Sequence, residues 1–90
     1  MQQDKEKILI FNTAVGDIIK ELLNNSNKSI SKFAREYDID RGNLSKFLRG
    51  INSCRLVTVW KIAEALDIDF VEFADMLKKR LGKDFSFYDE

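Results

Sequence analysis

Apolar residues recur at steps of three and four along nearly the whole chain, and this spacing constrains the fold more than any other feature. Between residues 5 and 24 they form one continuous stripe, made of Ile8, Phe11, Val15, Ile18 and Leu22 and widened by Ala14, Ile19 and Leu23. Such steps place side chains on one face of an α-helix, so this segment is expected to be a helix that buries that face. The chain contains no Pro and only four Gly among its 90 residues. It is therefore expected to consist of helices with short joints.

Polar residues with capping ability mark the second and third expected helices. Asn24 to Asn27 end the first helix, since short polar side chains compete with helical backbone bonding. Ser29 is a good N-cap for a second helix, whose apolar side carries Ile30, Phe33, Ala34 and Tyr37. Asp40 is expected to cap a third helix over residues 41–49 that Gly50 ends, with an apolar stripe of Leu44, Phe47, Leu48 and Ile51.

Two more helices are expected in the remainder of the chain. Ser53 or Arg55 opens a fourth, carried by Leu56, Val59, Trp60, Ile62, Ala63 and Leu66. Asp69 followed by Glu72 has the form of a capping box and starts a fifth, which uses Phe70, Phe73, Ala74, Leu77 and Leu81 and ends at Gly82. Five helices joined by short loops predict a compact all-α bundle, a single domain over residues 1–90, with no internal repeat.

The segment 83–90 is acidic and aromatic, because Phe85, Phe87 and Tyr88 lie beyond the last expected helix. Chain ends are more often polar. Two interpretations stay open: the rings fold back and cover the bundle, or they contact a second subunit, since exposed aromatic surface marks interfaces.

Composition argues against catalysis and against a cofactor. There is no His, which removes the commonest general base and metal ligand, and the single Cys54 allows neither a disulfide framework nor a structural zinc site. No apolar run is long enough to span a bilayer, and the polar start is unlike a signal peptide, so a cytoplasmic, reduced protein is expected.

Three minor patterns have simpler explanations. Residues 38–49 hint at a calcium loop, but Gly42 falls one place early and Arg49 stands where a Glu is needed. The carboxylates of Asp67, Asp69 and Glu72 are explained by helix capping. Cys54 has no His to activate it and is expected to be a buried, inert thiol. No enzyme and no metal site are therefore expected.

The third helix follows the second after a joint of about three residues, which is the spacing of a helix-turn-helix. At 100° per residue its basic face, free of acid, is formed by Arg41, Gly42, Ser45, Lys46 and Arg49, with Asn43 at the margin. The major groove of B-DNA accepts a helix and displays acceptor atoms on guanine. Arg41 and Lys46 are then the expected base readers, and Gly42 permits close approach of the backbone to the groove. The alternative is that these charges belong to an ordinary solvated helix face.

The chain resembles the Cro/repressor-type helix-turn-helix, the XRE family, whose fold is that of the lambda repressor. The resemblance is carried by residues 29–50, the helix-turn-helix proper, and by Leu56 to Ile68. Phe33-Ala34, Ile39, Leu44-Ser45-Lys46-Phe47, Arg49-Gly50 and Lys61-Ile62-Ala63 match the family pattern in register. The departures are Ile30 in place of a common Gln, Asp38 in place of a left-handed Gly, Leu48 in place of Glu and Cys54 in place of Pro.

The resemblance implies sequence-specific binding of double-stranded DNA by a small, repressor-like regulator of transcription. The residues implied to read bases are Arg41, Gly42, Asn43, Ser45 and Lys46, and those implied to contact phosphate are Ser29, Ser31, Arg49, Asn52, Ser53 and Arg55. One recognition helix is rarely selective enough, so a homodimer is expected, through the fifth helix and tail or through the first helix. A protein-interaction module, such as an antitoxin or an accessory factor, is the alternative.

The net charge of zero conceals an asymmetry. Residues 20–61 hold nine basic against four acidic residues, whereas residues 62–90 hold four against eight. The basic part contains the expected helix-turn-helix, so this is the side expected to face DNA.

Overall fold

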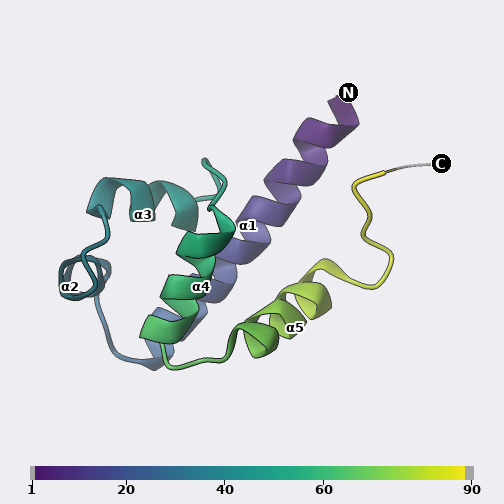
Figure 1. Ribbon diagram of the computed structural model, residues 1–90. Coiled ribbons are helices and arrows are strands. Elements are labelled where there is room, and N and C mark those ends of the chain that lie inside the picture. Colours follow the sequence, from purple (N-terminus) through teal and green to yellow (C-terminus); the bar gives the residue numbers. More distant parts are fainter. Residues whose placement is uncertain (1, 89–90) are drawn as a thin grey trace.

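The structure is a computed structural model that describes residues 2–88, with side chains described from residue 5 onward. Within that range it contains five helices and no strand: α1 (Gln2–Asn25), α2 (Ile30–Glu36), α3 (Arg41–Leu48), α4 (Leu56–Ala65) and α5 (Phe70–Leu81). Figure 1 shows α4 lying across α1, with α2 and α3 on one side and α5 on the other. The expected all-α fold of five helices is confirmed.

Side-chain caps begin three of the helices at the expected residues. The hydroxyl of Ser29 accepts from the backbone N–H of Lys32 at 3.1 Å, and Oδ1 of Asp40 accepts from that of Gly42 at 2.9 Å. Oδ1 of Asp69 accepts from the N–H of Val71 at 2.8 Å. Each bond satisfies a donor that the first helical turn leaves unpaired. α4 instead has Arg55 as its N-cap residue, and the side chain of Arg55 makes no capping bond.

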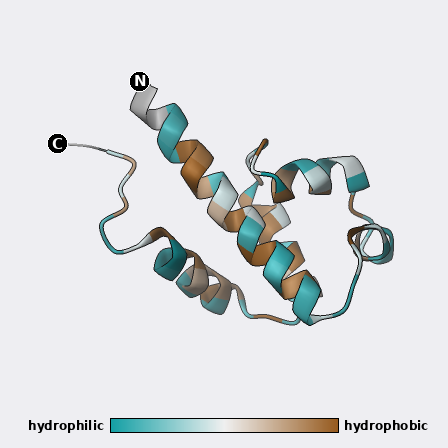
Figure 2. Ribbon diagram, turned by 180° about the vertical axis from the view of Figure 1, so that it is seen from behind, coloured by the Kyte–Doolittle hydropathy of each residue, from teal (hydrophilic) through white to brown (hydrophobic). Residues whose placement is uncertain are grey.

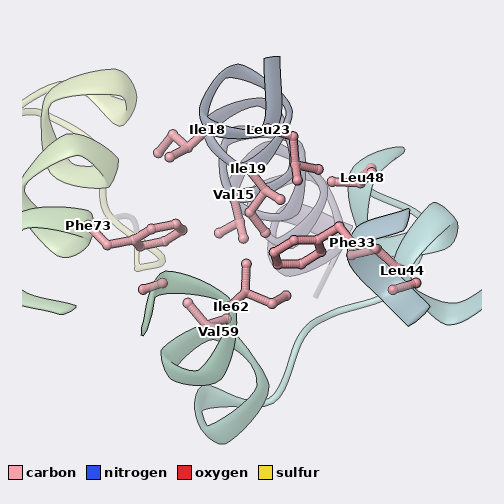
Figure 3. Packing of buried hydrophobic residues seen from close by; sticks show 12 residues of the cluster. Val15, Ile18, Ile19, Leu23, Phe33, Leu44, Leu48, Val59, Ile62 and Phe73 are labelled. Atoms are coloured by element: carbon pink, nitrogen blue, oxygen red, sulfur yellow. The ribbon is translucent and has the colours of Figure 1, made fainter. Parts of the chain in front are cut away.

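The core is a single cluster to which all five helices contribute. Its largest fully buried side chains are Ile18, Ile19, Phe33, Leu44, Ile62 and Phe73. In Figure 3 the side chains of α1 point into the space between the other helices, with Phe33 on one side and Phe73 on the other. The helix-turn-helix is thus held from behind by α1 and α4, and its opposite surface faces solvent.

Only part of α1 takes part in this core. Leu23 and Val15 are buried, but Ile8, Leu9 and Ile10 are 44%, 56% and 50% exposed. The amino-terminal half of α1 extends beyond the other helices and carries hydrophobic residues there, as Figure 2 shows. The apolar stripe predicted for α1 is therefore buried along its carboxyl-terminal part and left open at Ile8.

A close contact between α1 and the end of α3 fixes the position of α3. A Cβ on Gly16 would lie 2.6 Å from the carbonyl oxygen of Leu48 and 2.7 Å from that of Phe47. Real Cβ atoms do not approach backbone this closely, so only Gly fits at this point of α1. Just beyond, Gly50 has a φ of 74° and approaches Thr13. The two glycines let α3 end directly against α1.

One short turn sequence occurs twice in the chain. Residues 32–44 and 61–73, here called the first and second units, share Lys, Ala and the tripeptide Asp-Ile-Asp at equivalent positions. Asp38 and Asp67 have φ of 55° and 61°. The next N–H, of Ile39 or Ile68, donates to Ala34 or Ala63 at 2.8 and 2.9 Å. Both units are therefore helix-turn-helix elements with the same turn.

Besides Ile8, five residues predicted for apolar helix faces lie at the surface. Two belong to α2 and its end, where Ile30 and Tyr37 are 36% and 43% exposed. Ile51 is 57% exposed, because α3 ends before Gly50 turns the chain away from the core. Leu56, in the first turn of α4, is 66% exposed. Trp60 is 48% exposed but not unpartnered: its ring stacks on Phe70 with centroids 4.5 Å apart, and its N–H donates to Glu64.

The carboxyl-terminal aromatic residues fold back in part. Phe87 lies 5.5 Å from Phe11 of α1 and 5.1 Å from Phe85, measured between ring centroids. Nζ of Lys7 lies over the ring of Phe85 and donates to the carbonyl oxygen of Ser86. Tyr88 is 83% exposed. Phe85 and Phe87 thus cover α1, whereas Asp89 and Glu90 of the expected tail lie outside the described residues.

Candidate nucleic-acid interface

The joint between α2 and α3 is short and rigidly defined. Tyr37 ends α2, Asp38 takes the left-handed conformation predicted for it, and Ile39 packs against the core. Asp accepts this conformation at lower cost than most residues other than Gly and Asn. Because Asp40 then caps α3, the direction in which α3 leaves the turn is set by three consecutive residues.

The two faces of α3 are separated as predicted. Leu44 and Leu48 are buried, with 0% and 3% of their surface exposed. The opposite face is open to solvent at four of the predicted base readers and half-buried at Ser45; the open ones are Arg41, Gly42, Asn43 and Lys46. No Asp or Glu occurs between Asp40 and Glu64. The surface of α3 is therefore positive, and no acidic residue interrupts it.

Arg41 makes a contact that the sequence did not predict. Its Nε donates to Oγ of Ser31 at 2.6 Å, joining the first turn of α3 to the first turn of α2. Ser31 was expected to contact phosphate, and its hydroxyl proton is still available to donate. The two residues therefore form one group at the point where α2 and α3 meet.

Four predicted phosphate contacts lie at the surface on either side of α3. Ser29 precedes α2, while Asn52, Ser53 and Arg55 belong to the loop between α3 and α4; all are exposed. Figure 1 shows this loop projecting beside the end of α3. Helix starts and small hydroxyl or amide side chains suit phosphate oxygens, so their arrangement around α3 is compatible with a DNA backbone on both sides.

Asn12 of α1 anchors that loop and was missed by sequence reasoning. Its exposed fraction is 9%, and its Nδ2 donates to Oγ of Ser53 at 3.0 Å. A buried amide needs such a partner, since an unsatisfied one costs about 1–3 kcal/mol. An Asn between Phe11 and Ala14 on an otherwise apolar helix face was the available signal.

Arg49, the last predicted phosphate contact, ends α3. It is exposed, and its Nε donates to the carbonyl oxygen of Ser45 at 3.5 Å. A cation at this end of a helix interacts favourably with the unpaired carbonyl groups. Arg49 therefore stabilises the end of α3 and is itself exposed.

Ion pairs distinguish the two sides of the molecule. In the described part of the chain they join α1 and α5, where Arg80 pairs with Asp17 and Glu21, or lie within one of these helices, where Lys20 pairs with Asp17 and Lys79 with Asp75. Between residues 28 and 61 no ion pair forms among the described side chains. The cations around α3 thus keep their full charge toward an approaching anion.

The rival sites weighed from the sequence gain no support from the geometry. Burial raises the pKa of the Cys54 thiol to about 11, so the nucleophilic thiolate is scarce at neutral pH. The carboxylates of Asp40 and Asp69 are used as helix caps. Among the described residues, His, Cys, Asp and Glu do not gather in groups that could hold a metal ion.

None of the described helices is both long and apolar enough to cross a membrane.

Comparison with known proteins agrees with the geometry. Searches of curated proteins and of solved structures gave no significant match. A family model described as helix-turn-helix matches residues 19–73, which is more than half of the chain and runs from α1 into α5. This is a family of DNA-binding domains, which are typically not enzymes. The chain therefore belongs to the helix-turn-helix family of the XRE type, with the lambda-repressor-like all-α fold.

Proposed function

We propose that this protein binds double-stranded DNA at specific sequences by inserting α3 into the major groove, and that it is a small, repressor-like regulator of transcription. The observation that carries the proposal is the exposed face of α3, which bears Arg41 and Lys46, contains no acid and forms no ion pair with the described part of the chain. A helix of this kind fits the major groove in size and charge.

Each side chain then has a role set by its position. Arg41, Asn43, Ser45 and Lys46 read base edges, and Gly42 leaves room for the groove floor, since a Cβ there would meet only Oδ1 of Asp40, at 3.4 Å, among described atoms. Phosphates on one side are bound by Ser29 and on the other by Arg49, Asn52, Ser53 and Arg55, whereas the hydroxyl of Ser31 accepts from Nε of Arg41. Phosphate contacts supply affinity and register, and base contacts supply selectivity.

Selection of bound duplexes from a random DNA pool, followed by anisotropy titration, tests the proposal. Arg41→Ala and Lys46→Ala are each expected to weaken binding to the selected site by about 1–3 kcal/mol. Lys79→Ala removes the same charge from α5, where Lys79 pairs with Asp75, and is expected to leave binding unchanged. Failure to select any sequence, or equal affinity in all three variants, would refute the proposal.

A homodimer follows from the need to read two half-sites. The amino-terminal half of α1 is favoured over α5 and the tail, because Ile8, Leu9 and Ile10 are exposed there while Phe85 and Phe87 of the tail already cover α1. Sedimentation velocity tests this: Leu9→Glu is expected to shift a dimer to monomer. A wild-type chain that is monomeric at high micromolar concentration without DNA would exclude a preformed dimer.

A protein-interaction module is the second candidate function. It is favoured by the apolar surface at the start of α4, where Leu56 and Val57 are 66% and 64% exposed. Such surface commonly marks a protein interface. A tight complex with a protein partner that forms without DNA and is insensitive to salt supports this candidate.

A further inference from the structure

Ser31 and Arg41 form a bridge between α2 and α3 whose geometry bears on how bases are read. Ser31 is the second residue of α2, and Ser29 already caps that helix through Lys32. The hydroxyl of Ser31 is therefore not needed for capping, and it accepts from Nε of Arg41 at 2.6 Å. The bridge spans ten residues of sequence and closes the turn from the solvent side.

The bond to Ser31 uses one particular donor of Arg41. A guanidinium has five N–H donors in a rigid plane, and the Nε–H is one of them. Holding Nε leaves the two terminal nitrogens as a fork, and the bond restrains where that fork can point. Guanine presents O6 and N7 in the major groove, and a two-pronged donor is its best complement.

The surroundings of Arg41 leave that fork available. No carboxylate of the described chain forms an ion pair with it, and Oδ1 of the adjacent Asp40 is occupied by the N–H of Gly42. The next residue, Gly42, has no side chain to cover it. Lys46 is exposed like Arg41 but no hydrogen bond of the described chain holds its ammonium group, which is a flexible point charge.

We propose that Ser31 is a positioning residue that holds Arg41 for the recognition of one guanine in each half-site, and that selectivity at this base depends on both residues together. The inference rests on the proposed function and deepens it, since it names the base that the site requires. The inference also gives Ser31 a role different from that of the phosphate-binding residues, because Ser31 acts on DNA through Arg41.

A double-mutant cycle on the selected duplex tests the proposal. Ser31→Ala is expected to weaken specific binding about five-fold, the net effect of one ordinary hydrogen bond, and to leave binding to unrelated DNA within two-fold. In the Arg41→Ala background the same change is expected to have no further effect. Ser31→Thr retains the hydroxyl and is expected to restore affinity, and Ser26→Ala at the end of α1 is the matched serine control.

Replacing the contacted guanine by 7-deazaguanine, which lacks the N7 acceptor, adds a readout that a structural role would not change. The wild-type chain is expected to lose about ten-fold in affinity, and the Ser31→Ala variant less. Additive losses from Ser31→Ala and Arg41→Ala, an equal loss on unrelated DNA, or a selected site without guanine would overturn the inference while leaving DNA binding intact.

The bridge can also be followed without DNA. Hydrogen exchange of the Arg41 Nε–H, measured by nuclear magnetic resonance, is expected to be slow in the wild-type chain and fast in Ser31→Ala. Equal exchange in the two proteins would overturn the inference even if no duplex had been selected. Slow exchange combined with a failed selection would instead refute the proposed function and, with it, the role of the bridge in reading guanine.

Discussion

The first and second units use the same turn for different purposes. In each, an Asp in the left-handed conformation is followed by a core Ile and by an Asp that caps the next helix. The residues after the cap differ: Arg41-Gly42-Asn43 in the first unit, and Phe70-Val71-Glu72 in the second. The first set is polar and exposed, whereas Phe70 stacks on Trp60. The turn and the buried positions determine the path of the chain, and the exposed positions that follow determine what each helix contacts.

The largest effects are expected where the units are equivalent in the core. Phe73→Ala and Leu44→Ala remove side chains that are 1% and 0% exposed, and are expected to destabilise the protein by about 3–5 and about 2–5 kcal/mol. Urea denaturation followed by circular dichroism measures both. A loss below about 1 kcal/mol in one unit would mean that only the other belongs to the cooperative core.

A second change distinguishes the units through α1, since Gly16 contacts the end of α3. Gly16→Ala would place a Cβ 2.6 Å from the carbonyl oxygen of Leu48, and a cost of about 1–3 kcal/mol is expected to exceed the gain of about 1 kcal/mol in helix propensity. Gly42→Ala is the control for stability, because its Cβ has room and helix propensity alone predicts a small gain. Equal stabilisation of both variants in thermal unfolding would disprove the close contact.

The helix caps are expected to have matched, moderate effects. Asp40→Ala and Asp69→Ala each remove the acceptor for one N–H and are expected to cost about 1 kcal/mol. Asp40→Asn and Asp69→Asn keep an acceptor and serve as controls. Chemical denaturation of the four variants measures the losses, and only Asp40→Ala is expected also to weaken DNA binding, because α3 begins there. Unequal losses of stability would show that the two turns are not equivalent.

The smallest effect is expected at the left-handed positions. Asp38→Gly and Asp67→Gly relieve backbone strain but add entropy to the unfolded chain, so each is expected to change stability by less than about 1 kcal/mol. Calorimetric unfolding temperatures of the two variants give the comparison. A large loss at only one position would indicate that its carboxylate has a further role in the native state.

Local signals predicted much of this architecture from the sequence. Ser29, Asp40 and Asp69 were assigned as caps because their side chains act on the next few residues, and Leu44 and Leu48 were placed on the buried face of α3 by spacing alone. The same reasoning failed at Ile51: an apolar residue at helical spacing continues the stripe only if the helix continues, and Gly50 turns the chain first.

The spacing of residues in the sequence did not predict contacts between segments that are distant along the chain. Nothing near Gly16 in the sequence indicates that a carbonyl group of α3 will lie against it, and the partner of Asn12 lies 41 residues away. For the candidate site, the exposed polar face of α3 was predictable from periodicity. The bond from Arg41 to Ser31 was not, since it depends on the angle between α2 and α3.

The stack of Trp60 on Phe70 makes the second unit optically visible. Trp60 is the only Trp in the chain, and its half-exposed ring lies where α4 meets α5. Its fluorescence therefore monitors the joint of the second unit, whereas circular dichroism averages over all five helices. Melting curves recorded with the two signals in parallel will coincide if the protein unfolds in one step, and will separate if the recognition half of the molecule loosens first.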